Sequence, residues 1–441
     1  MAGSPGLRGS AVNASHAVSR KFCAETLPSL HEQGIHLEEH KLTKRPVVLT
    51  FVPYYLPGYK SGGPVRAVAN MVSRIGDNFH FKIFTSDRDF QDTRRYDGIN
   101  INEWTRVGKA MVYYCSHDKL SLSAISKILS ETQHDILYLN SFCSPRFTIA
   151  PLLLRRLKLV PRKPTILAPR GELATSALKL KAWKKTPYIL AARFLDLYSG
   201  ITWHASTLNE KNEIIDNIGN VRRVVVAEQI FIAEDLPPMH DDVPEAIRSK
   251  QPGELHLVFL SRICRMKNLK TALEVLCNVN IKGSVSFHIY GPIEDPGYWR
   301  QCQDALHHLP ENVTAEYRGM VKNSEVIKVF GNYDLFFLPT LGENFGHVIW
   351  EAMIAGCPVL ISDRTPWSGL RELGVGWDLP LSDIGGFRRT IANCVDMDQG
   401  EHRFWSKRAK SYALSKMHND EAVERNINLF HTTLLNGNGA G

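Results

Sequence analysis

The chain has 441 residues, which is more than one hydrophobic core usually serves, so two domains are expected. Its hydrophobic content of 44%, charged content of 22% and net charge of +8 are those of an ordinary soluble globular protein. The eight cysteines are scattered without a C-x-x-C pair, which argues against a zinc ribbon or a disulfide scaffold and favours reduced thiols in a cytoplasmic protein.

No apolar run approaches the length of a membrane span, and the first residues lack the apolar core of a signal peptide. We expect residues 1–44 to be a disordered extension or to reflect the choice of start site. The first predicted strand, 46–53, leads into a loop with Gly62 and Gly63 and then into an amphipathic helix over about 65–75. This arrangement can receive a phosphate or a closely packed backbone, although neither the dinucleotide fingerprint nor the P-loop pattern is present.

Predicted strands and helices then alternate along the chain. The first set of strands is expected near residues 79–85, 110–115, 135–140, 164–168, 201–204 and 222–226. The second set is expected near residues 255–261, 284–290, 313–317, 334–338, 358–361 and 376–379, before helical sequence over about 383–434. Strands separated by helices favour parallel α/β sheets.

Between the two sets, residues 228–256 break the alternation, and the acidic, proline-bearing stretch 233–242 predicts a surface linker. We therefore predict an α/β protein of two doubly wound, Rossmann-like domains facing a central cleft. Residues 45–235 would form the first domain and residues 236–402 the second. Residues 403–441 would hold a C-terminal helix that returns towards the first domain and a flexible tail.

The most informative stretch follows the strand predicted at 334–338. Its loop, 339–346, leads into a helix over about 346–356. Open α/β sheets bind ligands at such turns because loop amides and the helix N-terminus attract anions. Glu343 and Glu351 would repel a phosphate, so they favour neutral hydroxyls, and a nucleotide sugar has both kinds of group. The alternative is that Glu343 is a loop charge and Glu351 a solvated helix residue.

Two cations follow the first strand of the second set. Arg262 lies at the strand's end and Lys267 at the start of the next helix. Cations at a helix N-terminus oppose its dipole, which suggests that a bound anion compensates. An arginine fork with a lysine point charge is a sound way to hold a diphosphate. The alternative is a solvated basic loop.

These residues carry a resemblance to a known family. Its motifs, in this order and spacing, are Ser261-Arg262…Lys267-Asn268-Leu269, His288-Ile289-Tyr290-Gly291-Pro292 and Gly342-Glu343-Asn344-Phe345-Gly346…Glu351-Ala352. With them the chain resembles the retaining nucleotide-sugar glycosyltransferases of the GT-B fold, often called family four. The Gly62-Gly63 loop and Pro169-Arg170-Gly171-Glu172 fit the family too, and the resemblance covers about residues 46–430.

The resemblance implies an acceptor-binding first domain and a second domain that binds the nucleotide sugar. Arg262 and Lys267 would bind the donor diphosphate and stabilise the charge that develops on it, and Glu343 would accept hydrogen bonds from the transferred sugar. Donor-binding residues would also include Gly62, Gly63, Asn344, Phe345, Gly346 and Glu351, the last on the ribose hydroxyls. It further implies retention by front-face attack, no obligate metal and no cofactor besides the donor substrate.

The chain departs from the family pattern at two positions of the loop and helix. Asn344 stands where many members have a second glycine, and His347 where the residue is often apolar. A metal pair of His347 with Glu351 would lack a third ligand, so a histidine bonded to the substrate or to Glu351 is the better interpretation. Arg170 and His204 are candidates for the family's first-domain histidine. His204, among apolar neighbours, fits a core residue better, which leaves Arg170 and His347 as predicted substrate contacts.

Two basic, amphipathic stretches, 152–163 and 178–188, suit helices that lie on an anionic bilayer. The alternative is a basic solvated face with leucines packed inward, which we prefer for 152–163. From the second stretch we hypothesise peripheral association with the inner face of the plasma membrane and a saccharide or lipid-linked acceptor. Nucleic acid is not an expected partner, because no aromatic stacking platform or groove-reading motif is evident.

The leading interpretation is a cytoplasmic, retaining, metal-independent hexosyltransferase in polysaccharide or cell-surface glycan biosynthesis. One alternative is a nucleotide-sugar 2-epimerase of the same architecture, whose family lacks the arginine–lysine and glutamate pairs in this arrangement. Another is a non-catalytic nucleotide-sugar-binding or scaffold protein.

Overall fold

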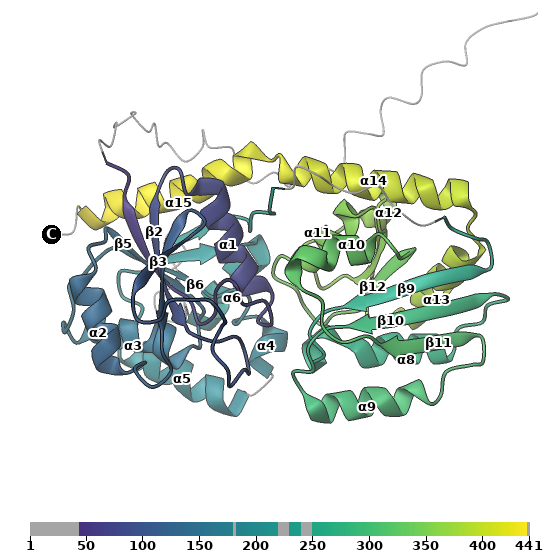
Figure 1. Cartoon of the computed structure of the whole chain (residues 1–441), viewed down its shortest axis with the longest axis horizontal. Coiled ribbons are helices and arrows are strands. Elements are labelled where there is room, and N and C mark those ends of the chain that lie inside the picture. Colours follow the sequence, from purple (N-terminus) through teal and green to yellow (C-terminus); the bar gives the residue numbers. More distant parts are fainter. Residues whose placement is uncertain (1–43, 180–181, 219–228, 240–248, 439–441) are drawn as a thin grey trace, which may run out of the picture. The chain divides into compact units, whose positions relative to one another are not determined.

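The structure, a computed structural model, describes residues 44–179, 182–218, 229–239 and 249–438 (Figure 1). The predicted extension, apart from Lys44, and the strand predicted near 222–226 lie outside these residues. The described residues from Arg45 onward belong to one compact unit that contains two β-sheets.

The first sheet has eight strands in the order β3-β4-β2-β1-β5-β6-β7-β8. They are β1 (Val47–Phe51), β2 (His80–Ser86), β3 (Trp104–Val107), β4 (Ala110–Cys115), β5 (Ile136–Asn140), β6 (Thr165–Ala168), β7 (Thr202–Ala205) and β8 (Ile230–Ile232). All neighbours pair in parallel except β3, which is antiparallel to β4 at one edge. Within the described residues the predicted strands are confirmed. β3 and β8, three or four residues each, were not predicted.

Apolar residues on both faces of β1 explain why helices cover both sides of this sheet. Val48 belongs to one buried cluster, which includes residues of α1 (Gly63–Ile75), whereas Leu49 and Phe51 belong to the other. Side chains alternate across a strand, so these two clusters lie on opposite faces. The remaining helices of this domain are α2 (Leu122–Glu131), the π-helical turn η2 (Pro145–Ile149), α3 (Ala150–Arg156), α4 (Thr175–Lys179), α5 (Ala182–Phe194) and α6 (Leu208–Ile218).

The second sheet has six strands in the order β11-β10-β9-β12-β13-β14, all paired in parallel, and all six were predicted. They are β9 (Glu254–Leu260), β10 (Ser284–Tyr290), β11 (Val313–Tyr317), β12 (Leu335–Leu338), β13 (Val359–Ser362) and β14 (Gly376–Leu379). Its helices are η3 (Arg265–Lys267), α8 (Leu269–Cys277), α9 (Pro296–Leu306), η4 (Asn323–Glu325), α10 (Val326–Phe330), α11 (His347–Ile354), α12 (Leu370–Leu373) and α13 (Ile384–Asp396). Every residue of β12 is buried, as expected for a central parallel strand.

Two long helices close the described chain, α14 (Gln399–Met417) and α15 (Asp420–Asn438). α14 packs on the second domain, where Trp350 Nε1 donates to the carbonyl of Ala413 at 3.0 Å. α15 lies beside α1 and the first sheet, with Phe430 in the core of the first domain (Figure 1). The predicted return of a C-terminal helix to the first domain is therefore confirmed, with α15 making the contact. The predicted boundary at residue 402 lies inside α14.

The prediction of a surface linker from residue 233 is wrong for its first part. β8 adds residues 230–232 to the first sheet, and Ala233, Asp235 and Leu236 are buried. The acidic and proline-rich composition of this stretch concealed Asp235 as an internal ion-pair partner, since its carboxylate binds Arg170.

Replacement of Phe430 by alanine should destabilise the first domain, because this fully buried ring contacts Phe79, Phe81 and Tyr138. Loss of a buried phenylalanine costs about 3–5 kcal/mol of unfolding free energy. Urea unfolding followed by circular dichroism measures this, with Leu435→Ala, an exposed position on the same helix, as control. Equal effects of the two variants would contradict the packing of α15 on the first sheet.

Candidate functional site

The candidate site lies at the carboxyl ends of the parallel strands β9 and β12. These strands are neighbours in the second sheet, so the loops that follow them, 261–268 and 339–346, leave the same edge. The loops are joined where Leu341 N donates to the carbonyl of Met266 at 2.8 Å and Asn268 Nδ2 donates to that of Pro339 at 2.8 Å. The predicted cations and carboxylates therefore come from two loops that hold each other in place.

This arrangement brings Lys267 and Glu343 into direct contact. Lys267 Nζ donates to Glu343 Oε1 at 2.5 Å, and both side chains are largely buried. The other predicted cation, Arg262, donates to Glu294 Oε2 at 2.6 Å and is about one-third exposed. Each cation thus lies beside a carboxylate, and an anion that binds here must compete with that carboxylate.

The start of helix α11 provides amides beside this ion pair. Its N-cap, Gly346, has a φ of 78° and gives no side-chain cap to the helix. A side chain at this positive φ would be strained, so the turn favours glycine. Amides at an uncapped helix start, together with the helix dipole, favour an anion. The site therefore combines a cation with a helix N-terminus.

The glycine-rich loop of the first domain reaches the same place. Gly62 is the N-cap of α1, has a φ of 71° and provides no side-chain cap. A Cβ on Gly62 would lie 3.8 Å from Arg262 Nε, whereas a Cβ on Gly63 would meet open space. A second uncapped helix start therefore faces Arg262, as expected if both domains contribute to one anion site.

Glu351 has an unpredicted partner, Arg66 of α1. Arg66 Nη1 forms an ion pair with Glu351, and its Nη2 donates to Asn323 Oδ1 at 2.8 Å. Glu351 is buried, and Arg66 lies beside its carboxylate as the counter-charge. The sequence did contain a signal for Arg66, because a cation in the first turn of a helix opposes its dipole, which is the reasoning that singled out Lys267.

Arg170, predicted to contact substrate, is directed into the first domain. Its side chain is only 4% exposed and forms an ion pair with Asp235. It also donates to side-chain oxygens of Tyr138 at 2.6 Å, Asn140 at 2.7 Å and Ser206 at 3.1 Å. Burial opposes the charge of Arg170, but Asp235 raises its pKa above the ordinary value, so the pair remains ionised. With these partners, Arg170 positions Asp235.

His347 lies opposite Asp235 rather than Glu351. Its Nε2 is 3.6 Å from Asp235 Oδ2, its ring is buried, and neither ring nitrogen has a hydrogen-bond partner within the part of the chain that the structure describes. Asn344 Nδ2 is also buried without a hydrogen-bond partner in that part of the chain. In those described ranges no group of three or more His, Cys, Asp or Glu could hold a metal ion. Two polar side chains next to the start of α11 therefore still have hydrogen-bonding capacity.

The rest of the Pro169–Glu172 loop orders the first domain. The Glu172 carboxylate accepts from Cys143 N at 2.6 Å, and Gly171 N donates to the buried Glu210 at 2.6 Å. A Cβ on Gly171 would lie 3.3 Å from Asn344 Cβ, so this loop meets the Glu343–Asn344 turn.

His204 is a core residue, as expected. It is 1% exposed and hydrogen-bonded to the hydroxyl of Tyr138 at 3.0 Å and to the carbonyl of Ala233 at 2.8 Å. Burial, helped by Arg170, lowers its pKa to about 3, so the ring is neutral at ordinary pH.

Of two hollows in the described residues, one lies at the carboxyl edge of the first sheet and the other near the amino end of β9. One, of about 680 Å³, is lined by residues that follow β2 and β4, among them Arg88, Arg94, Arg95 and Lys119, and so lies at the carboxyl edge of the first sheet. Asp89, next to it, accepts from the amides of Tyr59 and Lys60 in the glycine-rich loop. This hollow is a candidate for a second substrate.

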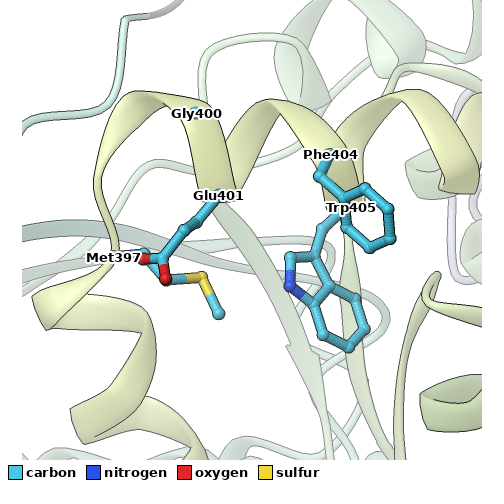
Figure 2. Close-up of a pocket in the computed structure, with 5 residues that line it drawn as sticks. All are labelled: Met397, Gly400, Glu401, Phe404 and Trp405. Atoms are coloured by element: carbon cyan, nitrogen blue, oxygen red, sulfur yellow. The ribbon is translucent and has the colours of Figure 1, made fainter.

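The other hollow, of about 430 Å³, is lined by Met397, Gly400, Glu401, Phe404 and Trp405 at the start of α14 (Figure 2). The carbonyl of Val395, just before it, accepts from Gly253 N at 2.8 Å, so it lies near the amino end of β9. That is the edge of the sheet opposite to the candidate site.

Comparisons with known proteins identify the fold. Residues 244–376 match the family described as Glycosyl transferases group 1. The chain is 13% identical to the solved Anabaena protein HepE in complex with UDP and glucose, with a TM-score of 0.59 over 88% of this chain and 99% of that one. The fold is GT-B. The predicted fold class is therefore confirmed.

Two curated relatives are similar over part of the chain. An uncharacterised glycosyltransferase of Methanocaldococcus jannaschii is 25% identical over 178 residues, and the D-inositol 3-phosphate glycosyltransferase of Paenarthrobacter aurescens is 25% identical over 175 residues. Each match covers 36% of this chain, and they cover 44% and 40% of the relatives' own lengths.

Replacement of Arg66 by methionine should destabilise the protein, because it leaves the buried Glu351 carboxylate without its cation. Breaking one partner of a buried pair costs about 3–5 kcal/mol, whereas an apolar replacement of both is often nearly neutral. Urea unfolding of Arg66→Met and of Arg66→Met/Glu351→Met measures this. The exposed pair of Lys109 with Asp77 serves as the control, and Lys109→Met should have no measurable effect. A double variant as unstable as Arg66→Met would refute the pairing argument.

Proposed function

We propose that the protein is a glycosyltransferase that moves a sugar from a nucleotide-diphosphate donor to a saccharide or lipid-linked saccharide acceptor with retention of configuration. The observation that carries this is the 2.5 Å contact of Lys267 with Glu343 beside the uncapped start of α11. In this proposal Lys267 would bind the diphosphate and the neighbouring carboxylate of Glu343 would accept hydrogen bonds from sugar hydroxyls. The family match of residues 244–376, and the UDP and glucose in the complex of HepE, support the proposal.

Donor binding would exchange the partners of two ion pairs. The diphosphate would take Lys267 and Arg262 from their carboxylates, together with the amides at the start of α11. Glu343, released from Lys267, would then accept hydrogen bonds from the transferred sugar. In the same way Glu351 would exchange Arg66 for the ribose hydroxyls. Arg66 lies one helical turn after Gly62 of the glycine-rich loop. No buried carboxylate would be left without a partner in either state.

The reaction would break the bond between the anomeric carbon and the diphosphate oxygen, and the electron pair would leave with the phosphate. Lys267, Arg262 and the dipole of α11 would stabilise that charge, which is electrostatic catalysis. The acceptor hydroxyl would attack the same face of the oxocarbenium-like sugar and give its proton to the departing phosphate oxygen. In this proposal the two cations and the helix dipole provide the positive charge, so the reaction needs no metal or other cofactor.

The acceptor would bind on the first domain. The hollow at the ends of β2 and β4 suits a polar ligand, and Asp89 links it to the glycine-rich loop that faces Arg262. A saccharide or lipid-linked acceptor is consistent with a place in polysaccharide or cell-surface glycan biosynthesis, in the cytoplasm at the inner face of the plasma membrane. A lipid-linked acceptor would also require a surface that binds the membrane.

Two other functions would use the same architecture. A nucleotide-sugar 2-epimerase would interconvert the donor, and a non-catalytic binding or scaffold protein would leave it unchanged. Incubation of UDP-, GDP- and ADP-sugars with and without acceptor separates the three cases. Release of the nucleoside diphosphate means transfer, interconversion means epimerisation, and an unchanged donor favours the scaffold.

Replacement of Lys267 by alanine should lower turnover by about 100-fold or more, since loss of one group that stabilises transition-state charge has such an effect. Lys270→Ala is the matched control, because Lys270 lies on the next helix and pairs at the surface with Glu274 at 3.4 Å. Steady-state release of the nucleoside diphosphate measures both variants. Near-wild-type turnover of Lys267→Ala, with the control also active, would overturn the diphosphate assignment.

A further inference from the structure

Helix α5 carries apolar side chains on two faces. On one face Ile189 and Ala192 are buried in the core of the first domain. On another face Trp183, Leu190 and Phe194 are exposed by 72%, 57% and 89%. Burial in the domain explains the first face and leaves the second unexplained.

The exposed residues form a continuous stripe. Trp183, Leu190 and Phe194, with the exposed Pro187, are separated by four, three and four residues, which is the spacing of one helix face. Single exposed apolar residues are common on proteins, whereas a contiguous apolar patch marks an interaction surface.

The stripe continues onto the end of α3. Arg156 Nε donates to the carbonyl of Leu195 at 2.9 Å, which holds the ends of α3 and α5 together. Beside this bond Leu195, Leu157 and Leu159 are exposed by 44%, 64% and 61%. We define the α5 face by its exposed apolar residues, which are Leu157, Leu159, Trp183, Leu190, Phe194 and Leu195.

The chain around the α5 face is strongly basic. Between residues 146 and 196 the sequence has twelve lysines and arginines and two acidic residues, Glu172 and Asp196. Of the twelve, the side chains of Arg155 and Arg170 are buried. The Glu172 carboxylate is turned inward, where it accepts hydrogen bonds from Ser141, Phe142 and Cys143. Arg156, Lys158 and Arg162 are among the exposed cations, the first two directly beside Leu157.

We propose that the α5 face binds the surface of an anionic lipid bilayer. Aromatic and leucine side chains that project from a basic surface can insert at the headgroup level while lysines and arginines meet lipid phosphates. Charge complementarity favours a bilayer over a second copy of the chain, because the exposed cations beside the α5 face would repel the same cations of that copy. No helix within the described ranges is long and apolar enough to cross a bilayer, so this contact is peripheral.

The structure keeps part of the stretch indicated by the sequence and extends it. In the stretch 178–188, Leu178 and Tyr188 pack against the domain core, whereas Trp183 is exposed, and the other exposed residues of α5 lie further along the helix. In the stretch 152–163, Leu152 and Leu154 are buried as expected, whereas Leu157 and Leu159 are exposed.

The α5 face is connected to the candidate site through α4. A Cβ on Gly342 would lie 3.1 Å from Ser176 Oγ of α4, and Lys185 of α5 donates to the carbonyl of Ala177 at 2.9 Å. A bilayer at α5 would therefore hold a lipid-linked acceptor near the loop that carries Glu343. This role in acceptor delivery rests on the proposed function, whereas the bilayer contact itself does not.

Co-sedimentation of the full chain with vesicles tests the contact. The probes are vesicles of pure phosphatidylcholine and of equimolar phosphatidylcholine and phosphatidylglycerol, at low and high salt. We expect binding to the anionic vesicles that high salt weakens. Leu190→Ser/Phe194→Ser should lower the partition about tenfold or more, because two side chains no longer leave water. Phe404→Ser, which removes an exposed phenylalanine from α14, is the matched control and should bind as the wild type does.

Several outcomes would overturn the proposal. They are the absence of binding to anionic vesicles at low salt, equal binding to both kinds of vesicle, and unchanged binding of Leu190→Ser/Phe194→Ser with an intact circular dichroism spectrum. Self-association that this variant abolishes, without vesicle binding, would assign the α5 face to a second copy instead. Turnover with a water-soluble acceptor separates the two proposals. If the wild type shows no turnover with a water-soluble acceptor, the proposed transferase is refuted. If the variant keeps the turnover of the wild type with this acceptor, only membrane binding has changed.

Discussion

The site depends on the parallel pairing of β9 with β12. Because both strands end at the same edge, Lys267 and Glu343, 76 residues apart in sequence, come within 2.5 Å of each other. A buried cation and a buried carboxylate are each costly alone and tolerable together. The same pairing brings together the two loops, of which the second carries Glu343 and leads into α11. The groups that we propose to bind the diphosphate and the sugar hydroxyls are thus already close together, which would limit the reorganisation that binding requires.

In the contacts between residues of the first and second domains, too, buried charged groups lie beside a group of opposite charge. Glu351 is matched by Arg66, and His347 lies opposite Asp235, which Arg170 holds. Burial would raise the pKa of Asp235, but Arg170, with a smaller contribution from His347, keeps it below its ordinary value, so the carboxylate stays charged. Each buried charge in the site therefore has an identified partner that a ligand would have to replace or share.

The sequence was sufficient for most strands of the two sheets and for the position of the loops that carry the candidate site, and it was insufficient for the ion pairs. Short apolar runs predicted the parallel strands of both sheets except β8, because such strands are buried on both faces, whereas β3 and β8 have only three or four residues each. Glycines and cations at strand ends indicated Gly62, Arg262 and Lys267, since their local conformation and charge are visible in the chain itself. Arg66 had a local signal in the sequence, but its partner Glu351 is far away along the chain, as Arg170 is from Asp235. The sequence indicated a bilayer-facing stretch at 178–188, but the exposed stripe of α5 could be defined only once the buried face of that helix was known.

Calorimetric titration of the wild-type protein with UDP, GDP and ADP, each compared with its own nucleoside, tests the central claim most directly. If Lys267, Arg262 and the start of α11 bind the diphosphate, one of the three should bind at least about 100-fold more tightly than its nucleoside, and high salt should reduce that difference. Equal affinities for a nucleoside and its diphosphate, or no binding of any of the three diphosphates, would contradict the account.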